Sequence, residues 1–144
     1  MTRKILVTAF IISFFAVLSA STSVFAQSSP TIKVTGPKSV KAGSVGTFTI
    51  KFNHGPKVKI PNEPPIEITI NTDGITGQGE PSFTSDAEGY INNSKITYKF
   101  KVSSDAQSGS TISVSGRVKF GYCSTETGVC KFGDQPFTVN VKIK

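Results

Sequence analysis

The stretch Lys95-Ile96-Thr97-Tyr98-Lys99-Phe100-Lys101-Val102 alternates polar and apolar side chains without a break. Because successive side chains of a β-strand point to opposite faces, this period of two predicts a strand with one buried face. The same alternation recurs in four other stretches, and no amphipathic helix pattern appears beyond the first 26 residues. We therefore expect an all-β chain of about seven or eight strands. The four stretches are 48–52, 66–70, 111–122 and 137–143.

Gly- and Pro-containing turns separate these strands, as at Asn53-His54-Gly55-Pro56. Strands joined by short turns must bury their apolar faces against a second sheet, which predicts an antiparallel β-sandwich. The entry into the 48–52 strand resembles that of bacterial immunoglobulin-like modules, so we expect an immunoglobulin-like sandwich. We expect one long irregular connection, from Asn71 to Tyr90, and a bulge or close packing at Gly116.

The N-terminus has the pattern of a signal peptide. Arg3 and Lys4 precede an uncharged apolar run, and Val24-Phe25-Ala26 has the small-residue spacing of a signal-peptidase site. No second apolar stretch follows that could span a membrane. We expect cleavage after Ala26, leaving no transmembrane segment, and a periplasmic or secreted product.

Residues 27–144 would then form one domain of 118 residues, which is large enough for a hydrophobic core. Loss of Arg3 and Lys4 lowers the net charge from +7 to +5. The remaining lysines are scattered singly along the sequence, and Arg117 is the one arginine left. A nucleic-acid binder would be expected to cluster its basic residues on one face. We therefore expect no nucleic-acid partner, with adhesion to anionic surfaces as a minor alternative.

Cys123 and Cys130 are the two cysteines of the chain. In an exported protein they should be oxidised, and with two candidates the pairing is forced. A structural staple on a hairpin is one interpretation, and a redox-active pair is the other. Lys131, beside Cys130, could favour a thiolate. Three aromatic neighbours could form an apolar collar around the sulfurs: Phe120, Tyr122 and Phe132.

We expect no metal site and no cofactor. Two thiolates with a single distant histidine, His54, make an incomplete zinc set. A hydrolase is also not expected, because no nucleophile with an oriented base can be recognised. Catalysis, if present, would be that of a thiol:disulfide oxidoreductase component.

Residues 95–144, with the long strand 113–120 followed by the Cys123 and Cys130 ring, resemble the N-terminal periplasmic domain of the thiol:disulfide interchange protein DsbD and its free-standing relatives. The resemblance implies an immunoglobulin-like sandwich whose cysteine pair exchanges electrons with a thioredoxin-like protein or a membrane electron carrier. It also implies a cap loop that shields the disulfide, for which the candidates here are Glu80, Phe83, Asp86 and Glu88.

Two hypotheses follow. The first is an exported thiol-disulfide exchange module, in which Cys123 and Cys130 react through a mixed disulfide with a thioredoxin-like or membrane redox partner. The second is a non-catalytic immunoglobulin-like binding or structural domain whose disulfide stabilises a hairpin. The resemblance favours the first hypothesis, and we expect the domain to be a monomer.

Overall fold

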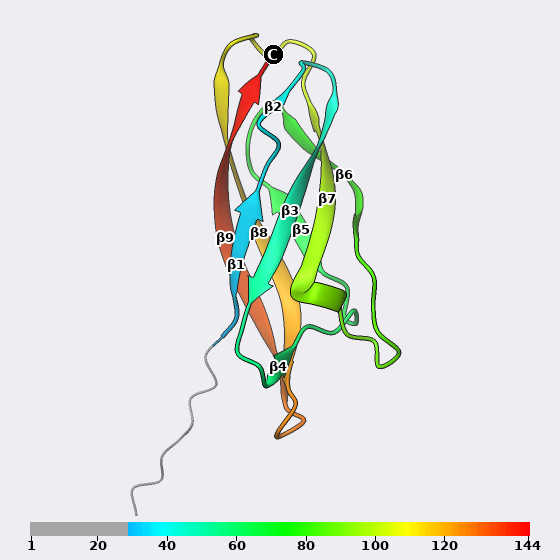
Figure 1. Ribbon diagram of the computed structural model, residues 1–144. Coiled ribbons are helices and arrows are strands. Elements are labelled where there is room, and N and C mark those ends of the chain that lie inside the picture. The colour runs from blue at the N-terminus through cyan, green and yellow to red at the C-terminus, as the bar shows by residue number, and fades with distance from the viewer. Residues whose placement is uncertain (1–28) are drawn as a thin grey trace, which may run out of the picture.

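The computed structural model describes residues 29–144, which form two β-sheets packed face to face (Figure 1). The predicted signal peptide and its cleavage after Ala26 lie outside the described residues. One sheet has four antiparallel strands. In spatial order they are β1 (Thr31–Thr35), β3 (Val45–Asn53), β7 (Lys95–Val102) and β6 (Ile75–Ser82).

The second sheet is built around the longest hairpin, β8–β9, whose register runs without a break from the Thr111–Lys142 pair to the Cys123–Cys130 pair. Its strands are β2 (Ser39–Val40), β9 (Cys130–Ile143), β8 (Thr111–Ser124) and β4 (Val58–Lys59), with β5 (Glu67–Ile70) also paired to β8. The β2–β9 pair is parallel and the other pairs are antiparallel. A short 3₁₀ turn, η2 (Asn92–Ser94), precedes β7. The predicted all-β sandwich of antiparallel sheets is confirmed.

The core consists of the apolar side chains that alternate along the strands. Phe48 and Phe100 are fully buried, and their rings stack with centroids 4.0 Å apart. Phe52 meets Phe120 of the other sheet with centroids 4.8 Å apart. Each such side chain contributes about 1.5–3 kcal/mol through its burial, so the alternation predicted from sequence is the main source of the fold's stability.

Two expectations about the elements are corrected. The connection 71–90, expected to be irregular, contains β6, an edge strand whose pairing with β7 shifts register between Gln78 and Ser82. Gly79, with φ +69°, and Pro81 interrupt the alternation there, which hides the strand in the sequence. The final strand, expected from the alternation at 137–143, begins earlier, because β9 starts at Cys130. Within residues 29–144, no helix is long and apolar enough to cross a membrane.

Gly116 of β8 marks a close approach, as the sequence analysis anticipated. A Cβ atom there would lie 2.3 Å from the Thr69 carbonyl oxygen and 2.6 Å from the Phe137 ring. The missing side chain therefore lets β5 and the Phe137 ring close over the middle of β8, which fixes the hairpin against its neighbours.

Candidate functional site

The cysteine pair closes the end of the β8–β9 hairpin. Cys123 and Cys130 occupy facing positions of the ladder, with Cα atoms 4.0 Å apart, and their sulfur atoms are bonded. The predicted pairing is therefore present. Cys123 is buried at 6% exposure, whereas Cys130 on the edge of the sheet is exposed. The disulfide thus lies across two strands that the backbone hydrogen bonds already align.

Backbone hydrogen bonds also hold the turn between the two cysteines. Ser124 donates its N–H to the Val129 carbonyl, and Gly128 donates to the Ser124 carbonyl, both at 2.9 Å. Gly128 has φ +69°, a left-handed conformation that glycine adopts at little cost. Thr125 donates to the Lys57 carbonyl at 2.9 Å, which ties the turn to the chain just before β4. The turn is therefore ordered by its own backbone as well as by the disulfide.

The four residues proposed to surround the sulfurs divide between the two faces of the sheet. Phe120 and Tyr122 are buried in the core, and strand alternation puts them on the face opposite to Cys123. Lys131 and Phe132 are both exposed on β9, but as successive residues they point to opposite faces. Lys131 is the register partner of Tyr122, whereas Phe132 pairs with Gly121 on the face of Cys123, and its side chain is 79% exposed. The structure therefore places one aromatic ring, not three, on the outer face of the hairpin.

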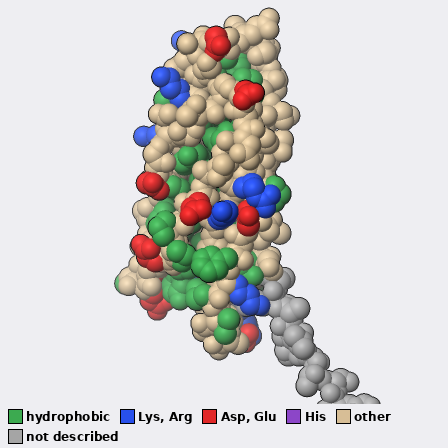
Figure 2. Space-filling model, turned by 180° about the vertical axis from the view of Figure 1, so that it is seen from behind, with side chains coloured by type: hydrophobic (Ala, Val, Ile, Leu, Met, Phe, Trp, Pro, Cys, Tyr) green, Lys and Arg blue, Asp and Glu red, His purple; other side chains and the backbone are tan. Residues whose placement is uncertain are grey.

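Phe132 belongs to an apolar area on the outer face of the second sheet. Its register partner is Gly121, over which Pro61 and Pro64 lie close enough to contact an added Cβ atom, at 3.4 and 3.5 Å. A hollow of about 210 Å³ lies next to it, lined by Pro64, Pro65, Glu67, Lys119, Phe120 and Phe132. Figure 2 shows apolar side chains gathered in the lower half of this face, below a belt of mixed charges.

The proposed cap residues lie on β6 and along the connection between β6 and η2. Glu80 is exposed on the edge strand β6. Phe83 is half-buried and packs against the core cluster, so it is part of the interior rather than of a lid. Asp86 and Glu88 both bind Lys59 of β4, through oxygen atoms 3.9 and 2.8 Å from its Nζ.

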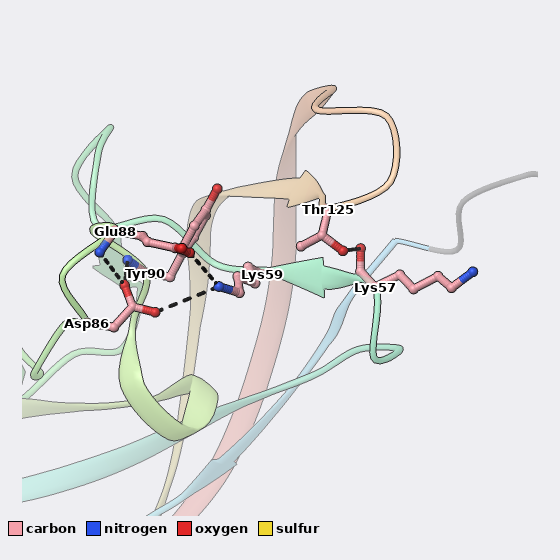
Figure 3. A network of polar contacts seen from close by, with 6 residues as sticks. All are labelled: Lys57, Lys59, Asp86, Glu88, Tyr90 and Thr125. Carbon is pink, nitrogen blue, oxygen red and sulfur yellow. Dashed lines mark hydrogen bonds and ion pairs between the residues drawn. The ribbon is translucent and has the colours of Figure 1, made fainter.

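The Lys59 network is the most developed set of polar contacts in this region (Figure 3). Asp86 accepts backbone hydrogen bonds from Glu88 and Tyr90, at 3.0 and 2.9 Å, which closes the loop on itself. The Lys59 ammonium also lies 4.5 Å from the centre of the Tyr90 ring. The hydrogen bond to Glu88 is the main cause that raises the pKa of Lys59, and the charges of Glu88 and Asp86 add to it.

This loop reaches the strand beside Cys123 without reaching Cys130. Lys59 is the register partner of Cys123, and Ile91 and Gly89 bond to Ile60 and Asn62 just beyond it, each at 2.8 Å. The spatial order is thus the loop, the β4 segment, β8 and then β9. The sequence analysis missed Lys59 and Tyr90, because only the pairing of β4 with β8 brings them to the hairpin.

The described part of the chain holds no cluster of three or more histidine, cysteine or acidic side chains that could bind a metal ion. His54 is half-buried, and its Nε2 lies 2.6 Å from the Ser94 hydroxyl. The imidazole therefore links the turn after β3 to η2, on a different element from the cysteines.

No family model and no curated protein matches this chain. Among solved structures, it is similar to BcpA, the major pilin subunit of Bacillus cereus, with a TM-score of 0.41 and 17% identity over 78% of this chain. The chain spans 40% of the BcpA chain. It is also similar to AggA, the major subunit of aggregative adherence fimbriae type I of Escherichia coli, with a TM-score of 0.39 and 10% identity. That match covers 81% of this chain and 95% of AggA.

The prediction of a thiol-disulfide exchange module is wrong. The similar solved structures are pilin and fimbrial subunits rather than redox proteins. Two of the proposed cap residues, Asp86 and Glu88, form ion pairs with Lys59. The predicted partners, a thioredoxin-like protein or a membrane electron carrier, are therefore also wrong. The same holds for the prediction of a monomeric electron carrier. The resemblance to the DsbD domain stays a prediction that no family match supports. Export to the periplasm or the outside of the cell stays a prediction.

Proposed function

We propose that this chain is an exported, non-catalytic β-sandwich domain that serves as a structural or binding subunit outside the cytoplasm. The observation that carries the proposal is the position of the disulfide in the ladder. Cys123 and Cys130 face each other at the end of an unbroken register. A bond at that position prevents the hairpin end from fraying and adds no new long-range connection.

The hairpin end that the disulfide holds presents a rigid outer face. The exposed Phe132 ring lies beside the proline-lined hollow, and the Lys59 network fixes the loop on the other side of β8. An exposed aromatic side chain on a rigid support is typical of surfaces that contact other molecules. This arrangement suits a structural or binding subunit, because it orients surface groups on the outer face of the hairpin.

A thiol-exchange assay tests the proposal. The oxidised protein is incubated with reduced thioredoxin, then quenched in acid, and free thiols are counted by alkylation and mass spectrometry. We expect Cys123 and Cys130 to stay bonded while insulin, as the control substrate, is reduced. Stoichiometric reduction within seconds, with the fold intact by circular dichroism, would contradict a non-catalytic role.

A double variant tests the structural half of the proposal. Cys123→Ala with Cys130→Ala should keep the wild-type circular dichroism spectrum and the wild-type surface contacts, with lower stability. If the fold is kept but a surface activity of the protein disappears together with the cysteines, the disulfide is a functional group and the proposal fails.

A further inference from the structure

The outer face of the four-stranded sheet collects lysines that are scattered along the sequence. Strand alternation directs five lysine side chains away from the core on β1, β3 and β7, and all five are exposed. They are Lys33, Lys51, Lys95, Lys99 and Lys101, and we call this surface the lysine face. The lysines are scattered singly along the sequence, but the sheet brings together positions up to 68 residues apart.

The register places three of these lysines in one row across the sheet. Lys33 pairs with Lys51, and Lys51 pairs with Lys95. Neighbouring strands are about 4.8 Å apart, and like charges directly opposite each other destabilise a sheet. Lys99 and Lys101 continue the positive charge along β7, where every second residue advances about 6.6 Å. Folding alone gives no reason for such a row, since it lowers stability.

The acidic residues that could neutralise the lysine face are elsewhere. Within residues 29–144, the ion pairs involve Lys57, Lys59, Arg117 and Lys119, and none involves a member of the lysine face. Three of these four cations belong to β4 and β8 of the second sheet, and Figure 2, which looks at the molecule from behind, shows acidic and basic side chains interspersed there.

The strands of the first sheet contain one acidic residue, Glu80, and it lies at the edge of the sheet on β6. Glu80 lines a hollow at the sheet edge together with Ile68 and Tyr98. Its charge contributes to the raised pKa of Tyr98, whose side chain points into the sandwich. Within residues 29–144, none of the five lysines therefore forms an ion pair, and no acidic residue lies on the three strands that carry them.

We propose that the lysine face binds a linear anionic polysaccharide. Lysines placed in a row across the sheet and along β7 match a chain that carries negative charges at regular intervals. Thr47, Thr49 and Thr97 lie among them and offer hydroxyl groups that can hydrogen-bond to sugar hydroxyls.

The side chains that are missing from the lysine face separate this ligand from two other polyanions. The face contains no arginine, which is the residue that reads phosphates and base edges by paired hydrogen bonds, and no aromatic ring on which bases stack. Its one exposed large apolar side chain is that of Val45, the register partner of Lys101, whereas membrane-binding surfaces enter the lipid interface with several apolar and aromatic side chains. Charge without stacking or insertion favours a hydrated polysaccharide over a nucleic acid or a lipid bilayer.

The test compares two triple variants that lower the net charge equally. The face variant carries Lys51→Gln, Lys95→Gln and Lys99→Gln. The control variant carries Lys38→Gln, Lys131→Gln and Lys142→Gln, three exposed lysines outside the lysine face. The affinity of each protein for heparin and for polygalacturonate is measured by isothermal titration calorimetry or surface plasmon resonance at several salt concentrations. Neutral dextran is the blank.

We expect the wild-type protein to bind both anionic polymers, with an affinity that falls as salt rises. The face variant should lose affinity by about tenfold or more, because three exposed charge contacts are removed. The control variant should stay within about twofold of the wild type. All three proteins should keep the same circular dichroism spectrum, since the substituted side chains are exposed.

Three results would overturn the proposal. One is the absence of binding to either polymer at low salt. Another is an equal loss in both triple variants, which would show an effect of net charge alone. The third is tighter binding of the wild type to double-stranded DNA or to phosphatidylserine vesicles than to heparin and polygalacturonate, with the loss again confined to the face variant. None of these results bears on thiol exchange, so the proposed function is tested separately.

Discussion

Removing the disulfide should weaken the domain without unfolding it. The bond joins residues seven positions apart, and closing a loop of about eight residues in the unfolded chain is worth about 2.5 kcal/mol. Replacing both cysteines by alanine also leaves a small gap at the buried position 123. We therefore expect Cys123→Ala with Cys130→Ala to lower the free energy of unfolding by about 2–3.5 kcal/mol.

Urea denaturation followed by circular dichroism measures this change. A loss of this size should move the midpoint down by about 1–2 M, with the slope nearly unchanged if the compactness of the unfolded chain changes little. Wild-type protein reduced with dithiothreitol and alkylated is a useful comparison, and its midpoint should fall by a similar amount.

The estimate rests on a hairpin whose ladder and turn bonds form without the disulfide. A loss below about 0.5 kcal/mol would show that the bond hardly restricts the unfolded chain, contrary to the loop-closure argument. Complete unfolding of the double variant at neutral pH and low urea would show that the disulfide, and not the register from Thr111 to Cys123, holds β8 against β9. Either result refutes the reasoning.

Three further predictions concern single residues. Gly116→Ala should lower the free energy of unfolding by about 1–3 kcal/mol in urea, because its Cβ would lie 2.3 Å from a β5 carbonyl oxygen; Gly55→Ala, with no atom within 4 Å of the new Cβ, should change it little. Lys51→Thr should raise the free energy of unfolding by about 0.3–1 kcal/mol at low salt. The gain should exceed that of Lys99→Thr, because the cross-strand neighbours of Lys99 are uncharged. An equal gain for both variants would contradict repulsion within the Lys33–Lys51–Lys95 row. Burial raises the pKa of Tyr98, so its neutral phenol contributes to stability below the ordinary tyrosine pKa, and this contribution is lost as the pH rises through the pKa of the folded state. An ultraviolet titration should show a late-ionising tyrosine in the wild type that is absent from Tyr98→Phe.

The sandwich could be predicted because its central strands carry uninterrupted alternation. Residues 95–102 read as one strand and are one strand, β7, and the 48–52 pattern lies inside β3. Burial of one face is the dominant energy of such a strand, so the sequence pattern and the structure report the same physical quantity. The cysteine pairing was equally predictable, because the chain offers one possible partner.

Edge elements were harder to predict, because they need less regular alternation. In β6, Gly77, Gly79 and Pro81 replace side chains that would continue the pattern, and the Tyr98 ring takes the space above Gly77. The lysine face was missed for a different reason. Its formation depends on which strands are neighbours and in what register, and neither is visible in the alternation of one strand.

The charge distribution links the proposed ligand to stability. A ligand that binds only the folded protein raises its stability in proportion to binding, and a polyanion on the Lys33–Lys51–Lys95 row would also replace repulsion with attraction. Heparin should therefore raise the unfolding temperature of the wild type, and the increase should be smaller for the face variant and unchanged for the control variant. A neutral sandwich face would be more stable alone and would gain nothing from the polymer. If heparin raises the unfolding temperature of all three proteins equally, the Lys33–Lys51–Lys95 row does not bind the polymer. The lysine face would then only destabilise the fold.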